Sequence, residues 1–341
     1  MHPLVQPLVE GPLDFIGDVH GEFGALECLL AMLGYRPDGS HPENRKLVFL
    51  GDLVDRGPDS LSVVRLVSEL MDAGQAQCVL GNHELNLMLG KAREGNQWFA
   101  GETQELREDG LLPQVLATAE ERLWISEFLK TLPIVLYRSD VRAVHACWDD
   151  SLVAKLRMSQ GPANDSFREW RQRIDDSLAR EHMDVRGLQG DLRRQNLNPI
   201  SVATSGIERR TAVPFWAGGR LRKVERVAWW ENYRSSPDVV FGHYWRSLDP
   251  MEEPIKAGPY LFSGLPLEAP LGPLQNAYCI DYSAGHRNVE RAQGRAFSLH
   301  TALAALRFPE KELILDDGRS WLMQPDPAYC QSIPGLRADR A

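Results

Sequence analysis

Short apolar runs, each followed by glycine and a polar loop, recur through the first 90 residues of this 341-residue chain. Residues 13–16, 47–50 and 76–80 have the length and β-rich composition of buried strands. A stretch with helically spaced apolar residues follows each run, at 25–33, 60–71 and 85–89. The pattern predicts three strand–loop–helix units, and therefore a parallel sheet with helical crossovers.

The loops after these three strands carry side chains that suit metals and phosphate. The first loop reads GDVHG, the second GDLVDRG and the third GNHE. Because the carboxyl ends of parallel strands lie side by side, we expect the three loops to meet in one cleft. The side chains predicted to meet there are Asp18, His20, Asp52, Asp55, Arg56, Asn82 and His83.

Later strands are predicted to bring two more imidazoles to the same edge. Residues 134–137 and 141–146 form two strand candidates around a turn, and His145 lies at the end of the second. Another short strand, 239–241, precedes Gly242-His243. A lone histidine at a strand end is usually structural, but these two follow three loops of ligand-type residues. We therefore add both to the candidate site.

The remaining segments are predicted to be helical or peripheral. Residues 91–130 indicate a helical layer, and 151–214 a polar insertion beside the site with one helix candidate at 167–178. A strand at 277–280 ends in Asp281, and 297–306 and 312–315 are predicted as edge or outer strands. We expect one domain over 1–323, followed by a tail over 324–341.

Composition and charge restrict the class of function. The chain is 43% hydrophobic and 25% charged, and its net charge of -9 argues against a surface that coats nucleic acid. Its five cysteines form no CxxC pair, which favours free thiols in a reducing compartment. No segment approaches the ~18 apolar residues of a membrane span. We therefore expect a cytoplasmic protein without a membrane partner that recognises phosphate locally.

The residue types indicate two divalent metal ions. Imidazole together with carboxylate and amide oxygen favours manganese, with iron or zinc as alternatives, over calcium or magnesium. Asp52, in the middle loop, is the natural bridge between two ions. The other ligands are assigned as Asp18 and His20 on one ion, and Asn82, His145 and His243 on the other. Two such ions bind a phosphoryl group and activate water, so hydrolysis of a phosphoester is the predicted chemistry.

Three further residues are assigned roles in the reaction. His83 lies next to the ligand Asn82 but is left without a metal, so we expect it to protonate the leaving oxygen. Asp55 would orient its ring and raise its pKa. Arg56 would clamp two phosphate oxygens with its planar fork.

In their order along the chain, these motifs resemble the calcineurin-type metallophosphoesterases. The resemblance is to the phosphoprotein phosphatase superfamily, which includes serine/threonine phosphatases and bacterial bis-nucleosyl tetraphosphatases. It implies a four-layer α/β sandwich of two mixed sheets flanked by helices, with a helical insert. It also implies the ligand set and the roles of His83, Asp55 and Arg56 given above, with Asn82 contacting phosphate as well.

The RGPDS, CIDYSAG and LRFPEKEL segments look most like the bacterial branch of this superfamily. Bacterial relatives often carry an arginine a few residues before an aromatic, upstream of the Gly-His motif. Arg226 before Trp229 fits best, so it is expected to bind phosphate. Arg220, Arg222 and Arg210 are the rivals for that role.

The motifs leave the substrate open among several classes. We expect a phosphoprotein-phosphatase-like activity with a broad range, because GDVHG and VDRG keep the His and Asp of the phosphatase branch. A bis(5′-nucleosyl)-tetraphosphatase or another nucleotide phosphohydrolase is the alternative. An inactive binding module is the rival of another class, and it is disfavoured because no ligand is missing. A nucleobase could stack on one of six tryptophans, Trp148, Trp170, Trp216, Trp229, Trp230 and Trp245.

Overall fold

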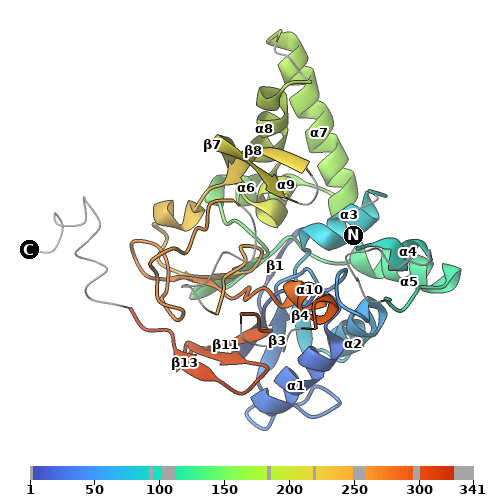
Figure 1. Ribbon diagram of the computed structural model, residues 1–341, viewed down its shortest axis with the longest axis vertical. Helices are drawn as coiled ribbons and strands as arrows, with labels where there is room; N and C mark the ends of the chain where they lie inside the picture. The colour runs from blue at the N-terminus through green and yellow to red at the C-terminus, as the bar shows by residue number, and fades with distance from the viewer. Residues whose placement is uncertain are drawn as a thin grey trace, which may run out of the picture.

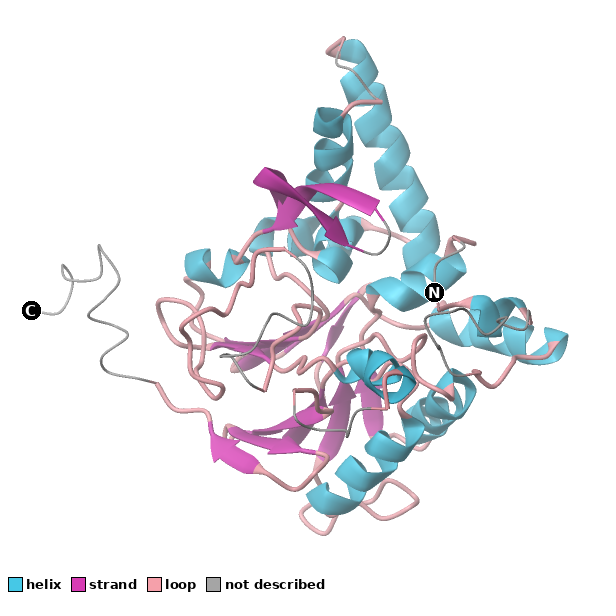
Figure 2. Ribbon diagram, in the orientation of Figure 1, coloured by secondary structure: helices cyan, strands magenta, loops and turns pink. Residues whose placement is uncertain are grey.

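Two mixed β-sheets and the helices around them form the body of the protein in a computed structural model (Figures 1 and 2). The structure describes residues 3–91, 95–101, 113–182, 186–217, 220–248, 258–294 and 300–325. The arrangement confirms the predicted α/β fold of two mixed sheets flanked by helices. Most of the predicted tail, from residue 326 onward, lies outside the described residues.

The larger sheet has six strands in the order β13-β12-β11-β2-β3-β4. Its parallel half consists of β2 (Leu13–Ile16), β3 (Lys46–Phe49) and β4 (Ala76–Cys78). Helix α1 (Phe23–Leu33) connects the first pair, and α2 (Ser60–Asp72) connects the second. The three predicted strand–loop–helix units are therefore present. Asp59 caps α2, because its side chain accepts a hydrogen bond from the Ser62 N–H.

The antiparallel half of this sheet corrects one prediction. It consists of β11 (Ala304–Phe308), β12 (Glu312–Leu315) and β13 (Ser320–Leu322). The segments 297–306 and 312–315 were expected as edge or outer strands. Instead, β11 begins at residue 304 and pairs with β2 and β12, and β12 also pairs with β13. An antiparallel neighbour from the end of the chain needs no crossover helix, so nothing local in the sequence marks its interior position. Residues 295–299 lie outside the described part of the chain.

The smaller sheet has five strands in the order β1-β5-β6-β9-β10. They are β1 (Val5–Pro7), β5 (Val135–Tyr137), β6 (Val141–Val144), β9 (Asp238–Phe241) and β10 (Ala277–Cys279). Sequence reasoning missed β1, a three-residue strand that ends in proline at the edge of the sheet. The parallel pairing of β6, β9 and β10 brings the strand ends near His145, His243 and Asp281 to one side.

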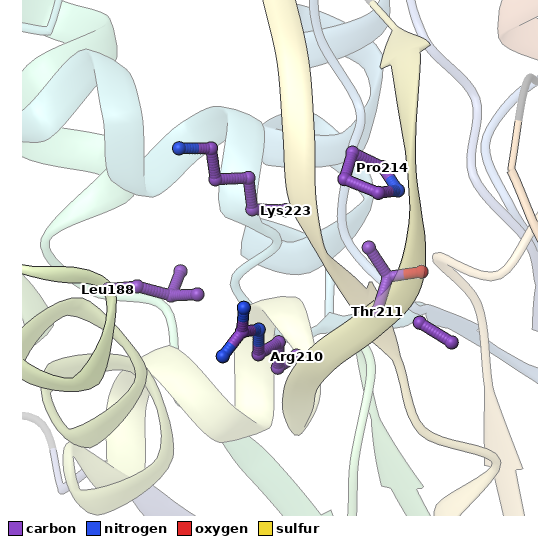
Figure 3. A pocket seen from close by; sticks show the side chains of 6 residues that line it. Leu188, Arg210, Thr211, Pro214 and Lys223 are labelled. Atoms are coloured by element: carbon purple, nitrogen blue, oxygen red, sulfur yellow. The ribbon is translucent and has the colours of Figure 1, made fainter.

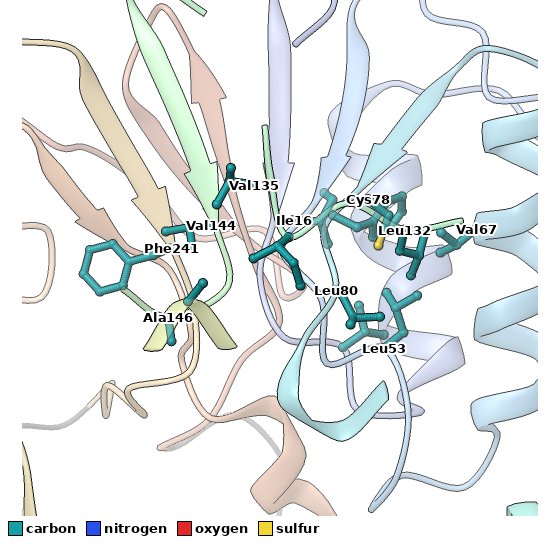
Figure 4. Close-up of a cluster of buried hydrophobic side chains, with 14 of the residues drawn as sticks. Ile16, Leu53, Val67, Cys78, Leu80, Leu132, Val135, Val144, Ala146 and Phe241 are labelled. Atoms are coloured by element: carbon teal, nitrogen blue, oxygen red, sulfur yellow. The ribbon is translucent and has the colours of Figure 1, made fainter. Parts of the chain in front are cut away.

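Alternate side chains of the strands divide the core into two clusters. Phe15 and Val48 pack with Leu136 and Val240 of the other sheet, and form the layer between the sheets. The intervening side chains belong to the larger cluster, which includes residues of the helices. Figure 4 shows part of this larger cluster: Ile16, Leu53, Val67, Cys78, Leu80, Leu132, Val135, Val144, Ala146 and Phe241. Burial on both faces explains why the strands appear in the sequence as continuous apolar runs.

The insertion beside the site contains more structure than its sequence predicted. In place of one helix it has α6 (Asp150–Met158), α7 (Ala163–Arg180), α8 (Leu188–Leu197) and α9 (Pro199–Ser205). A hairpin of β7 (Glu208–Ala217) and β8 (Arg220–Arg226) follows, and it crosses the expected boundary at 214. Helices α7 and α8 project from the body (Figure 1), so few of their side chains are buried and their apolar periodicity is sparse.

The predicted helical layer between 91 and 130 is present in part. It contains α4 (Gln97–Ala100) and α5 (Ala119–Leu129), and residues 92–94 and 102–112 lie outside the described ranges. Helix α3 (Asn82–Met88) begins three residues earlier than predicted, so two candidate site residues belong to its first turn. Short helices η1 (Trp229–Asn232), η2 (Ala284–His286) and α10 (Arg287–Ala292) lie between later strands. In the ranges that the structure describes, no helix is both long and apolar enough to cross a membrane.

Candidate metal centre

The loops after β2 and β3 are bound to each other through their backbones. The N–H groups of Val19 and His20 donate to the Asp52 carbonyl over 3.1 and 2.8 Å. Several non-glycine residues here have positive φ, including His20 and Asp52 at 48° and Arg56 at 72°. Such backbone costs about 1–3 kcal/mol per residue and persists where surrounding contacts fix it. The loops therefore present their side chains in one imposed geometry.

Glu84 supplies much of that fixation, although sequence reasoning gave it no role. Its buried carboxylate accepts hydrogen bonds from the N–H groups of Asp52 (2.9 Å), Leu53 (2.7 Å), Val54 (3.3 Å) and Gly81 (3.0 Å). Burial and the neighbouring Asp52 raise the pKa of Glu84 to about 7. Glu84, the last residue of the GNHE motif, thus holds the loop after β3 against the loop after β4.

Three of the predicted histidine ligands are oriented by backbone carbonyls. His20 Nδ1 lies 3.0 Å from Val54 O, His145 Nδ1 2.7 Å from Leu50 O and His243 Nε2 3.1 Å from Ser205 O. Because a carbonyl can only accept, each of these ring nitrogens carries a proton, which leaves the other nitrogen of the ring as the one that a metal ion could bind. This is the orientation that second-sphere carbonyls give to metal-binding imidazoles. Ser205 ends α9, so the insertion contributes to this arrangement.

Two buried groups of ligand-type atoms share Asp52. One consists of His20, Asp52 and His83, the other of Asp52, His145 and His243, and the ligand atoms of each lie within 4.8 Å of one another. His20 Nε2 is 3.6 Å from Asp52 Oδ2, and His145 Nε2 is 3.4 Å from Oδ1. Each oxygen of the carboxylate therefore faces a different group. Asp52, which the sequence predicts as the bridge between two ions, therefore lies between the two groups.

Asp18 and Asn82 lie beside these groups. The Asp18 carboxylate accepts from the His243 N–H over 3.2 and 3.1 Å. A Cβ at Gly242 would lie 1.9 Å from Asp18 Oδ1, so only glycine allows this approach. The Asn82 amide oxygen points at His145 Nε2 and at other acceptors, the Thr204 carbonyl and His243 Nδ1. An amide oxygen that faces three acceptors has no donor to bind. Either the amide group turns its NH2 toward these acceptors, or a cation lies between them.

The buried charges also fit divalent cations. Burial and the nearby Asp281 raise the pKa of Asp18 well above its usual range. Although burial opposes it, the imidazoles of His145 and His83 hold the pKa of Asp52 well below that range. Burial also opposes charging of His145, but Asp52 and Asp18 raise its pKa to about 10. His20 Nε2 is buried without a hydrogen-bond partner among the described residues. Metal ions there would satisfy this nitrogen and offset the clustered carboxylates.

His83, Asp55 and Arg56 form a connected set at the edge of the first group. His83 Nδ1 lies 2.6 Å from Asp55 Oδ2, and Trp98 Nε1 donates to Asp55 Oδ1 over 2.7 Å. Sequence reasoning missed this contribution of Trp98, which comes from the helical layer. Arg56 Nη2 is 3.2 Å from His83 Nε2. Since a guanidinium only donates, His83 Nε2 accepts from it, and a cation at that nitrogen would face the charge of Arg56.

Arg226 and the tryptophans lie in different places relative to this centre. Arg226 Nη1 donates to the His243 carbonyl over 2.7 Å, so the side chain borders the second group. Trp148, Trp229 and Trp230 are buried in the core, and Trp216 is exposed on β7. Trp245 is half-buried, with its ring 4.4 Å from the Arg56 guanidinium carbon. Of the six predicted tryptophans, Trp245 is the one in contact with a candidate catalytic group.

The two-sheet sandwich thus has buried His and Asp groups that share a carboxylate at its strand ends, as a site for two metal ions would need. Residues 11–174 match the family model of the calcineurin-like phosphoesterases. The matched range contains the loop motifs and His145, whereas His243 lies beyond it.

Two curated relatives carry related names. The asymmetrical bis(5′-nucleosyl)-tetraphosphatase PrpE of Oceanobacillus iheyensis is 49% identical over 74 residues, which are 21% of this chain and 30% of the relative. The symmetrical bis(5′-nucleosyl)-tetraphosphatase of Ralstonia nicotianae is 33% identical over 135 residues, 40% of this chain and 41% of that protein. The chain spans less than half the length of either relative. The crystal structure of a cold-active protein-tyrosine phosphatase from a Shewanella species aligns over 95% of this chain and 83% of that one, with 15% identity and a TM-score of 0.49.

Proposed function

We propose that this protein is a metal-dependent phosphohydrolase that cleaves bis(5′-nucleosyl) polyphosphates. One observation carries the hydrolase part: two buried groups share Asp52, one of them includes His83, and Arg56 lies beside that histidine. The names of both curated relatives support the dinucleotide over the phosphoprotein substrate that we expected from the sequence. Phosphoprotein-phosphatase-like activity becomes the second candidate, and an inactive binding module the third.

The proposed ligands are Asp18, His20, Asp52, Asn82, His145 and His243. Two divalent ions held by them would supply Lewis-acid polarisation of a phosphoryl oxygen and an activated water. Manganese is the proposed metal, because the site mixes imidazole with carboxylate and amide oxygen. A reducing, cytoplasmic setting is proposed as well, and it agrees with the four described cysteines, all of which are free thiols.

The chain's own residues would orient the phosphate and move a proton. Arg56 would turn its guanidinium from His83 Nε2 toward two phosphate oxygens. His83 Nε2, then protonated, would donate to the leaving oxygen, while Asp55 accepts from Nδ1 and stabilises the imidazolium. The Trp98 indole N–H keeps Asp55 in place by binding its other oxygen. Arg226 is proposed to contact phosphate from the hairpin side.

A side-by-side substrate panel tests this function. The enzyme is assayed with manganese on diadenosine tetraphosphate, phosphopeptides, mononucleotides and p-nitrophenyl phosphate, and again with a chelator. We expect kcat/KM for the dinucleotide to exceed that for phosphopeptides by about 100-fold or more. A preference for phosphopeptides would overturn the dinucleotide assignment. No hydrolysis of any substrate by folded, metal-loaded protein would overturn the enzyme assignment.

A further inference from the structure

A hollow lined by cationic side chains lies apart from the metal centre, between the β7–β8 hairpin and helix α8. Its volume is about 520 Å3, which lies within the range of ligand-binding pockets. Arg210, Thr211 and Lys223 line it together with the apolar residues Leu188, Ala212 and Pro214. Figure 3 shows the side chains of Arg210 and Lys223 extending from the hairpin into the same hollow, with Leu188 of α8 opposite them.

An irregularity in the hairpin brings these two cations together. The register pairs Arg210 with Val224 and then Phe215 with Arg222, so residues 211–214 form a bulge opposite Lys223. A regular ladder would direct Lys223 and Arg210 to opposite faces, because neighbouring residues of a strand alternate. The bulge re-aims the side chains, as bulges beside functional sites commonly do. The sequence signal for it is Pro214, which lacks the N–H that a regular ladder needs.

The charges in this hollow are not compensated locally. Neither Arg210 nor Lys223 has an ion-pair or hydrogen-bond partner for its side chain within the described part of the chain. No carboxylate is among the described lining residues. The neighbouring Arg209, by contrast, donates to Glu225 over 2.7 Å. In a chain with a net charge of -9, two unpaired cations around one hollow form a local site for an anion.

The hairpin connects this hollow to the metal centre. At its inner end Glu208 pairs with Arg226, whose guanidinium donates to the carbonyl of His243. Arg210 lies two residues farther out on β7, about 7 Å at the usual rise of a strand. A polyphosphate with one phosphate at the metal centre extends beyond it toward further cations. The apolar residues of the hollow can pack against a nucleoside.

We propose that this hollow binds the distal phosphates and the second nucleoside of a nucleoside polyphosphate. The proposal rests on the proposed function for the link to catalysis, but the binding itself can be measured without turnover. The proposal also predicts a difference between two substrates, because p-nitrophenyl phosphate has neither distal phosphates nor a nucleoside to occupy the hollow.

The test compares the Arg210→Ala/Lys223→Ala double variant with wild type and with Arg209→Ala. The control removes a cation from the same strand that does not line the hollow. We expect the double variant to raise KM for diadenosine tetraphosphate about 5- to 20-fold, as for the loss of two partly exposed charge contacts. KM for p-nitrophenyl phosphate and the melting temperature should match those of wild type. Unchanged KM for the dinucleotide, or equal changes for both substrates, would overturn the proposal.

Binding of ATP to metal-free protein, by calorimetry in the presence of a chelator, gives an independent readout. We expect wild type and Arg209→Ala to bind ATP, and the double variant to bind it about 5- to 20-fold more weakly. Equal binding by all three proteins, or no binding by wild type, contradicts the proposal. If ATP binding weakens as expected but diadenosine tetraphosphate is not hydrolysed, the binding site stands and the proposed function fails.

Discussion

The guanidinium carbon of Arg56 lies 4.4 Å from the centre of the Trp245 ring, and Nη2 of the same group is 3.2 Å from His83 Nε2. Trp245 itself is held with φ at 51°, and its N–H donates to Asp281 Oδ2 over 2.9 Å. The ring thus fixes the plane of the guanidinium beside the candidate proton donor. This arrangement makes Trp245 a positioning residue for the proposed phosphate clamp.

Replacing Trp245 should weaken phosphate binding through Arg56. A cation–π contact contributes about 0.5–2 kcal/mol, so Trp245→Ala should raise the inhibition constant of inorganic phosphate roughly 2- to 30-fold. Trp245→Phe keeps an aromatic face and should retain most of the affinity. Manganese content should stay the same in both variants. In an Arg56→Ala background, Trp245→Ala should have little further effect, and a full additional loss would show that Trp245 acts independently of Arg56.

Removal of the shared carboxylate should abolish metal binding and activity together. Asp52→Asn leaves one oxygen and adds an amide N–H group, which cannot bind a cation, so both groups lose their common ligand. We expect lower manganese content by elemental analysis and loss of p-nitrophenyl phosphate hydrolysis. Asp59→Asn is the matched control on the same loop, because asparagine caps a helix as well as aspartate does. Full metal content in Asp52→Asn would exclude the bridging role.

Replacement of His83 distinguishes a proton donor from a metal ligand. As a proton donor, His83→Asn should keep both metals and lower kcat about 10²–10⁴-fold. The geometry allows either role, because His83 Nε2 lies 3.9 Å from Asp52 Oδ2 and is also close to Arg56. The exposed His182→Asn serves as the control. Loss of one metal from His83→Asn, measured beside it, would make His83 a ligand instead.

Replacement of Glu84 should loosen the loop that carries Asp52. Its carboxylate accepts four backbone N–H groups, and the amide nitrogen of glutamine would face some of these donors without an acceptor. We expect Glu84→Gln to cost about 1–3 kcal/mol of unfolding free energy and to weaken manganese binding. Thermal melting with and without manganese measures both effects. Glu69→Gln, on the exposed face of α2, should melt as wild type does. Equal melting of the two variants would remove the structural role of Glu84.

The sequence alone determined the parallel half of the larger sheet and the composition of the site. The runs before Gly17, Gly51 and Gly81 are buried on both faces, so their hydrophobicity marks them without knowledge of their neighbours. Since parallel strands align their carboxyl ends, the three loop motifs had to converge once those strands paired. Local pattern and strand polarity were sufficient for that inference.

Only the tertiary structure decided which other groups hold the candidate site residues in place. Glu84, Trp98 and the Ser205 carbonyl bind site residues up to 43 positions away along the chain, and no local pattern encodes such pairs. The place of β11 inside the larger sheet and the hairpin beside His243 depend on pairing between distant segments. Those pairings arise from side-chain packing and from hydrogen bonds between segments that become neighbours only after folding. The sequence therefore indicates the candidate ligands, and only the fold decides their orientation.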